Sequence, residues 1–446
     1  MHTSSICKVA GVLFSALVLF SAGGCNSSKK PDTPAVESGA DAPATTTAAP
    51  ATTTAATEAE LPIGEPKEFE VDANGLLAGA LPESELQEGW VNLFDGQSLY
   101  GWFIFGKANW RVEEGTIKVD RGEKSFLCTN LKLADYELKV DFRADAKTNS
   151  GVFLRTQPSP QDVTMDCLEL NIAPPDNPFP TGSLVQRKKL EPAELGKFDP
   201  TTWHTYLIRL QGDQVTITLD GKKMLEYTDD SGLGRGHISL QHNEGRVEFK
   251  NIRLRPLAPQ PLKVDASWED DWVRSAKEGA EFNIESTDAG LKVTGGLGQL
   301  QSKADFGDFF LQATYQLAKP EVNSGIFFRC VRDAMLDGYE CQLNHAMKDS
   351  DPLQPADAGA GGIFRRAPAR LVVGDGSKPT YITLLAIGPQ FATWVNGIQV
   401  VEFEDTRPAD DNPRKGLRLA PGPISLQGHD PTTEATFKSI KLTEIK

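Results

Sequence analysis

The chain has 446 residues and a formal net charge of −15, with an isoelectric point near 5.0. Such an acidic chain is a poor partner for nucleic acid or for an anionic membrane surface, because both carry negative charge. At roughly 150 residues per domain, the length suggests two or three domains.

The first 25 residues predict export. An apolar run from Val9 to Phe20 follows Lys8, and it is too short to cross a bilayer as a helix. Small residues at 22–24 then precede Cys25, an order that resembles a bacterial lipoprotein signal. The alternative is ordinary secretion with an incidental cysteine. We expect a lipoprotein of the outer membrane or periplasm, which contacts the membrane only through a lipid on Cys25.

Residues 26–65 are rich in Ala, Thr and Pro and contain almost no bulky apolar side chain. Such a segment cannot bury enough surface to fold, so a disordered linker is predicted. A flexible linker behind a lipidated cysteine would hold the folded part away from the membrane.

From Gly89 onward the pattern is that of β-strands. Residues 137–143 alternate polar and apolar side chains, as a half-solvated antiparallel strand does. Long helical periodicity is absent, and the stretches 174–200 and 348–378 have the composition of long loops. We therefore predict an all-β fold of the jelly-roll type, with the first β-sandwich over 66–257.

The same landmarks recur roughly 170–190 residues later. Asn149–Arg155 and Asn323–Arg329 both read Asn-Ser-Gly, then apolar β-formers, then Arg. Further matched segments are 168–171 with 339–342, 238–241 with 424–427, and 247–254 with 435–442. Repeats of this length are whole domains, since solenoid units have periods of ~20–50 residues. A second, more divergent sandwich is predicted over 258–446.

The arginine that ends each repeated strand is the first candidate for function. Alternation along a strand places Phe153 and Arg155 on one face, opposite Val152 and Leu154. Arginine is almost never buried unless it is paired. One arginine could simply reach water at a sheet edge, but its recurrence favours a concave groove of the size of a carbohydrate.

Four cysteines lie beyond the signal, in an exported setting where disulfides persist. The sequence allows the disulfides Cys128–Cys167 and Cys330–Cys341, but it cannot establish either pairing.

Several motifs together resemble the 3-keto-disaccharide hydrolase family. They are Asn-Leu-Phe-Asp-Gly-Gln-Ser-Leu-Tyr-Gly-Trp at 92–102, the Asn-Ser-Gly-Val-Phe-Leu-Arg strand, Trp203-His204 and Leu219-Asp220-Gly221. The resemblance is strong over 88–257 and weaker, but in register, over 265–446. It implies two tandem concanavalin A-like jelly rolls, frequent in exported bacterial proteins, that act on glycosides whose sugar carries a ketone at carbon 3.

A ketone at carbon 3 acidifies the proton on carbon 2, so a base can remove it while the aglycone leaves from carbon 1. Such a site needs a base and a positive group near the developing enolate. The resemblance implies these roles for Arg155, Glu169, Asn171 and His242 in the first copy, and for Arg329, Glu340, Gln342 and His429 in the second. Asn243 stands where the first copy should have its histidine, and His242 would point the other way. If histidine is the essential proton carrier, we expect the activity in the second copy. The alternative is that Glu169 acts as the base without a histidine, in which case the first copy is active.

Three further alternatives remain at this stage. The pairs Arg155–Glu169 and Arg329–Glu340 could be cross-strand ion pairs that only stabilise the sheet. The protein could be a tandem carbohydrate-binding, lectin-like protein without catalysis. No cofactor is certain, although a divalent metal ion is possible, with loop aspartates such as Asp176, Asp349 and Asp351 as oxygen ligands.

Overall fold

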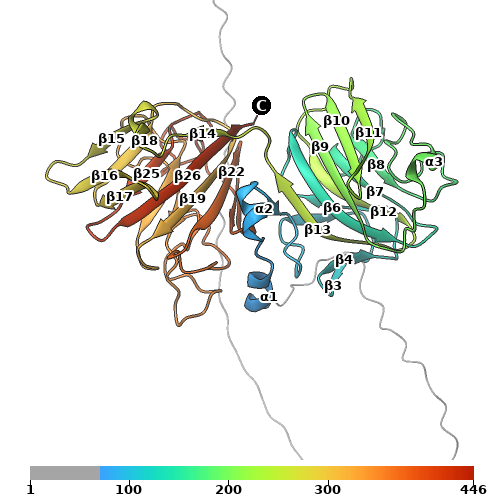
Figure 1. The fold of residues 1–446 in the computed structure, drawn as a ribbon, viewed down its shortest axis with the longest axis horizontal. Helices are drawn as coiled ribbons and strands as arrows, with labels where there is room; N and C mark the ends of the chain where they lie inside the picture. The colour runs from blue at the N-terminus through green and yellow to red at the C-terminus, as the bar shows by residue number, and fades with distance from the viewer. Residues whose placement is uncertain (1–70, 446) are drawn as a thin grey trace, which may run out of the picture. The chain divides into compact units, whose positions relative to one another are not determined.

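The computed structural model describes residues 71–445. The predicted signal, Cys25 and the linker to residue 65 lie outside the described residues. Strands β1–β13 form the first sandwich, drawn in cyan to yellow-green in Figure 1, and β14–β26 form the second, drawn in yellow to red.

The first sandwich has an eight-stranded and a five-stranded sheet. The larger sheet runs in the order β11 (Lys222–Thr228), β10 (Gln214–Leu219), β9 (His204–Gln211), β6 (Tyr136–Ala144), β13 (Val247–Arg255), β4 (Thr116–Val119) and β3 (Arg111–Glu113), with β1 (Val91–Asn92) beside β13. The smaller sheet runs in the order β2 (Trp102–Phe105), β5 (Ser125–Thr129), β12 (His237–Glu244), β7 (Asn149–Thr156) and β8 (Leu168–Ile172).

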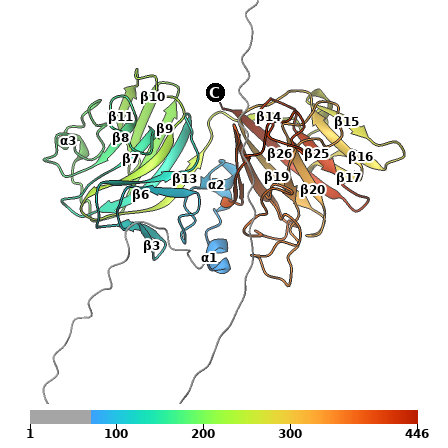
Figure 2. The ribbon, with the colours of Figure 1, turned by 180° about the vertical axis from the view of Figure 1, so that it is seen from behind.

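The second sandwich repeats this plan, and Figure 2 labels most of its strands. Its larger sheet runs in the order β16 (Phe282–Thr287), β17 (Gly290–Gly295), β26 (Glu434–Glu444), β19 (Phe309–Leu317), β22 (Thr380–Ile387), β23 (Gln390–Val395) and β24 (Ile398–Glu404), with β14 (Gln260–Leu262) beside β26. Its smaller sheet runs in the order β15 (Trp272–Ala276), β18 (Gly298–Ser302), β25 (Ser425–Gly428), β20 (Ser324–Phe328) and β21 (Tyr339–Leu343).

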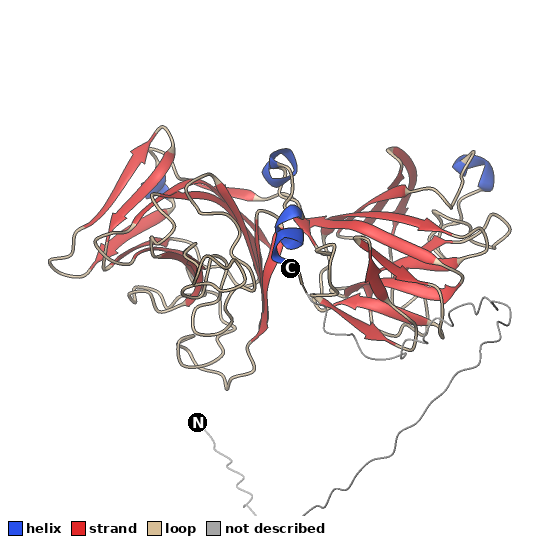
Figure 3. Cartoon of the chain, turned by 90° about the horizontal axis from the view of Figure 1, so that it is seen from below, coloured by secondary structure: helices blue, strands red, loops and turns tan. Residues whose placement is uncertain are grey.

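Each strand of one sandwich has a counterpart at the same place in the other. The smaller sheets show this directly, since β2-β5-β12-β7-β8 corresponds to β15-β18-β25-β20-β21. The predicted all-β fold and its duplication are therefore confirmed. Figure 3 shows how little helix there is: α1 (Ala73–Ala78), α2 (Glu83–Gln87), α3 (Pro192–Leu195) and the 3-10 turn η1 (Trp268–Asp270). None of the helices in residues 71–445 is both long and apolar enough to cross a membrane.

The core of each sandwich lies between its two sheets. Every second side chain along a strand points into it. In β6, Leu138, Val140 and Phe142 are fully buried in the core, whereas Lys139 and Asp141 are half-buried on the other face. Each fully buried side chain of this size contributes about 1.5–3 kcal/mol. The period-two pattern that predicted these strands is thus the pattern that fills the core.

The four cysteines beyond the signal are free thiols, so neither disulfide that the sequence left open is formed. Cys341 faces the apolar core of the second sandwich, and Cys128 and Cys167 belong to an apolar cluster on the other face of the first sandwich's smaller sheet. Burial raises the pKa of Cys128 to about 11 and that of Cys167 to about 12. These thiols stay protonated and unreactive at neutral pH.

Candidate functional site

The first sandwich places a carboxylate and an amide on the outer face of its smaller sheet. Val152 and Leu154 of β7 enter the core, so Gly151 and Phe153, which alternate with them, face outward. On the neighbouring strand β8, Glu169 lies opposite Phe153, and Asn171 lies opposite Gly151. The repeated Asn-Ser-Gly strand therefore lies beside this pair, whose two residues are among those that the family resemblance implies.

A third polar side chain, which the sequence analysis did not nominate, completes the set. Gln241 of β12 lies opposite Gly151 from the other side, so two amides flank one glycine. Ser150 fixes this pairing, because its hydroxyl donates to the Gln241 carbonyl at 2.7 Å. The signal was present in the sequence, since Gln241 ends the segment that recurs at 424–427.

The second sandwich contains the same set on β20, β21 and β25, which neighbour one another in its smaller sheet. Glu340 lies opposite Phe327, and Gln342 lies opposite Gly325. The Ser324 hydroxyl donates to the Gln427 carbonyl at 2.8 Å, as Ser150 does in the first copy. Each sandwich thus combines one glutamate with two amides around a glycine.

Both glutamates are almost completely buried, with 7% of Glu169 and 6% of Glu340 exposed. Desolvation by burial raises the pKa of each carboxyl to about 7, against the partial opposition of Lys124 for Glu169 and of Arg414 and then His429 for Glu340. A carboxyl that titrates near neutral pH is suited to general-base chemistry, because it is both available and basic there.

The surroundings of the two glutamates differ. An Arg414 nitrogen lies 3.7 Å from a Glu340 oxygen, and its guanidinium stacks over the Phe327 ring at 5.4 Å. His429 follows Gln427 by two residues and is partly exposed, with its Nδ1 2.8 Å from the Asp430 carboxylate. Arg414 comes from a long loop without a counterpart in the repeat pattern, so nothing in the sequence pointed to it.

A small pocket of about 60 Å³ lies beside Glu340. Phe364, Arg365, Pro413 and Arg414 are among its walls. This space has room for a few water molecules at most. A sugar ring can therefore enter only if side chains such as that of Arg414 move aside.

The repeated arginines do not lie in this site, which corrects the sequence-based prediction. Arg155 has a left-handed backbone with φ 49°, and β7 gains one extra residue against β12 between Phe153 and Thr156. This β-bulge breaks the alternation that placed Arg155 beside Phe153. Arg329 has the same φ of 47°.

Both guanidiniums serve the fold instead. Arg155 pairs with Asp135 at 3.0 Å, and Arg329 pairs with Asp308 at 2.9 Å. The cross-strand pairs Arg155–Glu169 and Arg329–Glu340, which the sequence left open, are therefore not formed. The arginines' remaining bonds go to backbone carbonyls, so neither has a donor directed at a glutamate.

The His242 side chain points away from the first site, as the sequence predicted. His242 alternates with Gln241 on β12 and therefore faces away from the Glu169 set. It is buried, its Nδ1 has no partner in the described part of the chain, and burial lowers its pKa. Among residues 71–445 no three His, Cys, Asp or Glu side chains are grouped as metal ligands.

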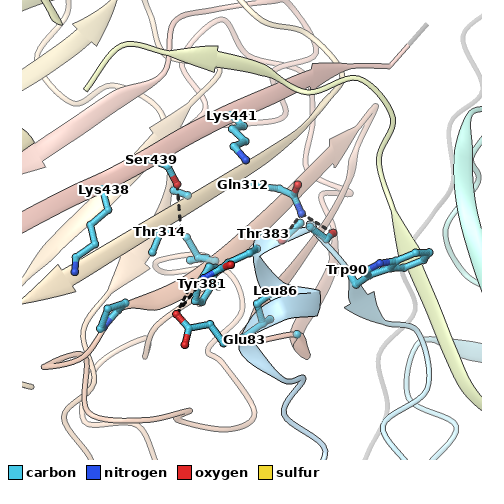
Figure 4. Close-up of a pocket in the computed structure, with 16 residues that line it drawn as sticks. Glu83, Leu86, Trp90, Gln312, Thr314, Tyr381, Thr383, Lys438, Ser439 and Lys441 are labelled. Carbon is cyan, nitrogen blue, oxygen red and sulfur yellow. Dashed lines mark hydrogen bonds between the residues drawn. The ribbon is translucent and has the colours of Figure 1, made fainter. Parts of the chain in front are cut away.

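A larger hollow of about 360 Å³ lies between α2 and the outer face of the second sandwich's larger sheet. Figure 4 shows Trp90, Tyr381, Lys438 and Lys441 around it. It shares no residue with the set around Glu340, and Trp90 is already covered by two cations stacked on its ring.

Two jelly rolls, each with a buried acid on the outer face of its smaller sheet, define a duplicated sandwich protein. The chain belongs to the family of 3-keto-alpha-glucoside-1,2-lyase-like domains, whose model matches twice, over residues 89–255 and 264–443. A comparison with curated proteins found no match.

Solved structures similar to the chain include carbohydrate-active proteins. A proposed glycosyl hydrolase from Parabacteroides distasonis ATCC 8503 is 21% identical, with coverage of 40% of this chain and 99% of that chain and a TM-score of 0.35. A second from the same organism is 23% identical, with coverage of 34% and 93% and a TM-score of 0.29. A carbohydrate-binding module from Bacillus subtilis is 15% identical, with coverage of 34% and 94% and a TM-score of 0.27.

Proposed function

We propose that this protein cleaves the glycosidic bond of 3-keto-glycosides, with the second sandwich as the catalytic one. The observation that carries the proposal is the buried Glu340, whose pKa of about 7 suits a general base and whose carboxylate lies 3.7 Å from Arg414. The family supplies the substrate class, because its name describes the cleavage of 3-keto-α-glucosides.

In the proposed reaction the Glu340 carboxylate removes the proton from carbon 2. The electron pair of that C–H bond forms the double bond between carbons 1 and 2, and the bond from carbon 1 to the glycosidic oxygen breaks. Arg414 stabilises the negative charge that develops on the ketone oxygen. His429 gives a proton to the departing alcohol and is recharged by solvent. Addition of water across the new double bond then completes a net hydrolysis.

The test is to incubate the purified protein with 3-keto-sucrose and to follow fructose release by chromatography. Release of fructose with formation of an unsaturated 3-keto sugar, or of its hydrate, supports the proposal. Lack of release with a panel of 3-keto-glycosides, with and without divalent metal ions, contradicts it.

The pH dependence of kcat/KM provides a second prediction. Glu340 must be ionised to act as a base, so kcat/KM should rise about tenfold per pH unit below pH 7 and level off above it.

The free energy of unfolding should change with pH in the opposite direction. A carboxyl whose pKa is raised in the folded state stabilises the fold below pH 4.5 and loses that contribution as the pH rises through 7. Urea midpoints of the wild type and Glu340→Gln, compared between pH 4 and 8, isolate this effect. A kcat/KM profile with its limb near pH 4.5 would contradict a buried base.

A specific observation favours a different role for the first sandwich. Asn243 stands where the second copy has His429, and Glu169 has no ion-pair partner among the described residues, in contrast to Glu340. An amide cannot exchange a proton usefully. We infer that the first sandwich holds carbohydrate without cleaving it, and that two linked sites increase the affinity for larger glycans.

The location remains a proposal that rests on the sequence alone. If Cys25 is lipidated, Cys25→Ser should move the protein from the membrane fraction to the soluble periplasmic fraction, because the acyl chains would be lost. Immunoblots of fractionated cells that produce either form measure this, with Cys128→Ser as a control at a buried thiol. Unchanged membrane association of Cys25→Ser would mean that another anchor holds the protein.

A further inference from the structure

One turn has the same shape in both sandwiches but carries a different charge in each. The turn is 184–188 in the first sandwich and 363–367 in the second, and the first residue of each pairs with the preceding strand and with the last residue of the turn. The third residue has a left-handed backbone in both, with φ 56° at Gln186 and 59° at Arg365. Gln186 and Arg365 therefore correspond, as do the arginines that follow them.

These following arginines, Arg187 and Arg366, are paired differently. In the first sandwich Arg187 forms an ion pair with Asp229 at 2.8 Å, and both side chains are buried. Asp229 comes directly after β11, and Asp405 comes directly after β24, which is the corresponding edge strand of the other larger sheet. Asp405 is held by Arg407, whose guanidinium donates to both carboxylate oxygens at 2.8 Å. The partner that Arg187 has is thus already taken in the second sandwich.

The second sandwich therefore contains two guanidiniums without a carboxylate. Arg366 donates to the main-chain carbonyls of Arg365 at 3.1 Å and of Arg414 at 2.8 Å. Arg365 is exposed, and its guanidinium lies over the Phe364 ring at 5.2 Å. Arg407 and Arg414 have carboxylate partners, whereas in residues 71–445 neither Arg365 nor Arg366 has one.

Both guanidiniums line the pocket of about 60 Å³ beside Glu340, together with Arg414. Among the described residues that line it, only Glu340 carries a carboxylate. Burial, and then the like charge of Arg407, lower the pKa of the Arg366 guanidinium. Three guanidiniums around one carboxylate make this a positively charged spot on a chain whose net charge is −15.

The size and the donors of this pocket fit a carboxylate. A guanidinium presents parallel N–H donors that match the two oxygens of a carboxylate. Space for a few water molecules is too small for a sugar ring, but it is enough for one carboxylate group. A neutral hydroxyl would leave the excess positive charge unbalanced.

We infer that Arg365 and Arg366, next to Arg414, form an anion subsite that binds a carboxylate of the substrate, so that the second sandwich prefers acidic glycosides. The inference deepens the proposed function and rests on it for the sugar ketone. It adds the charge of the substrate. The first sandwich lacks the subsite, because it has Gln186 in place of Arg365 and its Arg187 is neutralised by Asp229.

The test compares acidic and neutral glycosides of the same shape. The carboxylate can belong to the departing alcohol or to the sugar, so two pairs of 3-keto compounds are used. They are the 4-carboxyphenyl and 4-carbamoylphenyl glucosides, and the phenyl glucuronide and its amide. In at least one pair kcat/KM of the full chain should be about tenfold higher for the acid, as expected for charged hydrogen bonds. Equal values in both pairs would overturn the inference.

Arg365→Gln is the informative variant, because it installs the residue that the first sandwich has in the same turn. The acid-to-neutral ratio of kcat/KM should fall about tenfold, and Arg365→Lys should retain most of it. Gln186→Arg, the matched control in the first sandwich, should leave the ratio as in the wild type. General damage to the fold lowers both kcat/KM values together, so a ratio that Arg365→Gln leaves unaltered would contradict the subsite.

Salt provides a readout that a structural role would not move. Raising NaCl from about 0.05 to about 0.5 M should lower the ratio in the wild type, because the exposed Arg365 is screened. The same change should have little effect in Arg365→Gln. A wild-type ratio that is independent of salt would count against an anion subsite.

Binding without a ketone separates this inference from the proposed function. In calorimetric titration, 4-carboxyphenyl glucoside or phenyl glucuronide should bind the wild type more tightly than Arg365→Gln. Such a preference without turnover of any 3-keto compound would sustain the subsite and refute the proposed function. Turnover of acid and amide with equal kcat/KM would do the reverse.

Discussion

Glu340→Gln should lower kcat on 3-keto-sucrose by about 10²–10⁴-fold, the usual effect of losing a general base. The substitution keeps the size of the side chain and removes a buried carboxyl whose pKa is raised to about 7. An amide cannot take the proton from carbon 2, whereas the binding contacts of the site persist. KM should therefore change far less than kcat.

Glu169→Gln is the matched control, because Glu169 has the same place in its sheet as Glu340. Each glutamate lies opposite the phenylalanine of the repeated strand. Its carboxyl has the same raised pKa of about 7 but lacks an equivalent of Arg414 at 3.7 Å. We expect kcat to stay within a few-fold of the wild type. Should Glu169→Gln abolish turnover while Glu340→Gln preserves it, the assignment to the second sandwich is wrong.

The fold was predictable because the alternation of apolar and polar residues along its strands is periodic, and because the same segments occur twice in the chain. Strands such as β6 alternate core and solvent-facing residues over nine positions, and the landmarks of the two copies keep their order. The family resemblance named Glu169 with Asn171 and Glu340 with Gln342 as site residues, and the repeat shows that these two pairs stand at matching places in the two copies. Gln241 and Gln427 were available by the same reasoning.

The misplaced arginines show where sequence reasoning stops. A period of two holds only while the strand is regular, and one extra residue between Phe153 and Thr156 reverses the direction of Arg155. Nothing in the residues themselves announces this bulge. Arg414 was missed for another reason: it reaches Glu340 from a long loop, and loop geometry follows from tertiary contacts that have no period.

Arg329→Leu should destabilise the second sandwich by about 3–5 kcal/mol, as the loss of one partner of a buried ion pair does. The Arg329 side chain has no exposed surface and pairs with Asp308 at 2.9 Å. Its other bonds reach the carbonyls of Gly307 at 3.1 Å, Gly388 at 2.5 Å and Arg418 at 3.1 Å. Leucine satisfies none of these acceptors. Urea unfolding followed by circular dichroism should show an earlier transition for the second sandwich.

Arg329→Lys decides between a structural and a catalytic role for this residue. An ammonium keeps the charge beside Asp308 but cannot form the fork that bridges Asp308 and three carbonyls, so stability should fall by an intermediate amount. Arg155→Lys, with its own pair to Asp135 at 3.0 Å, should have a similar effect on the first sandwich. The kcat of folded Arg329→Lys should stay within a few-fold of the wild type, because the Arg329 side chain has no exposed surface with which to reach a substrate. A hundredfold loss of kcat at unchanged stability would instead show that Arg329 has a catalytic role.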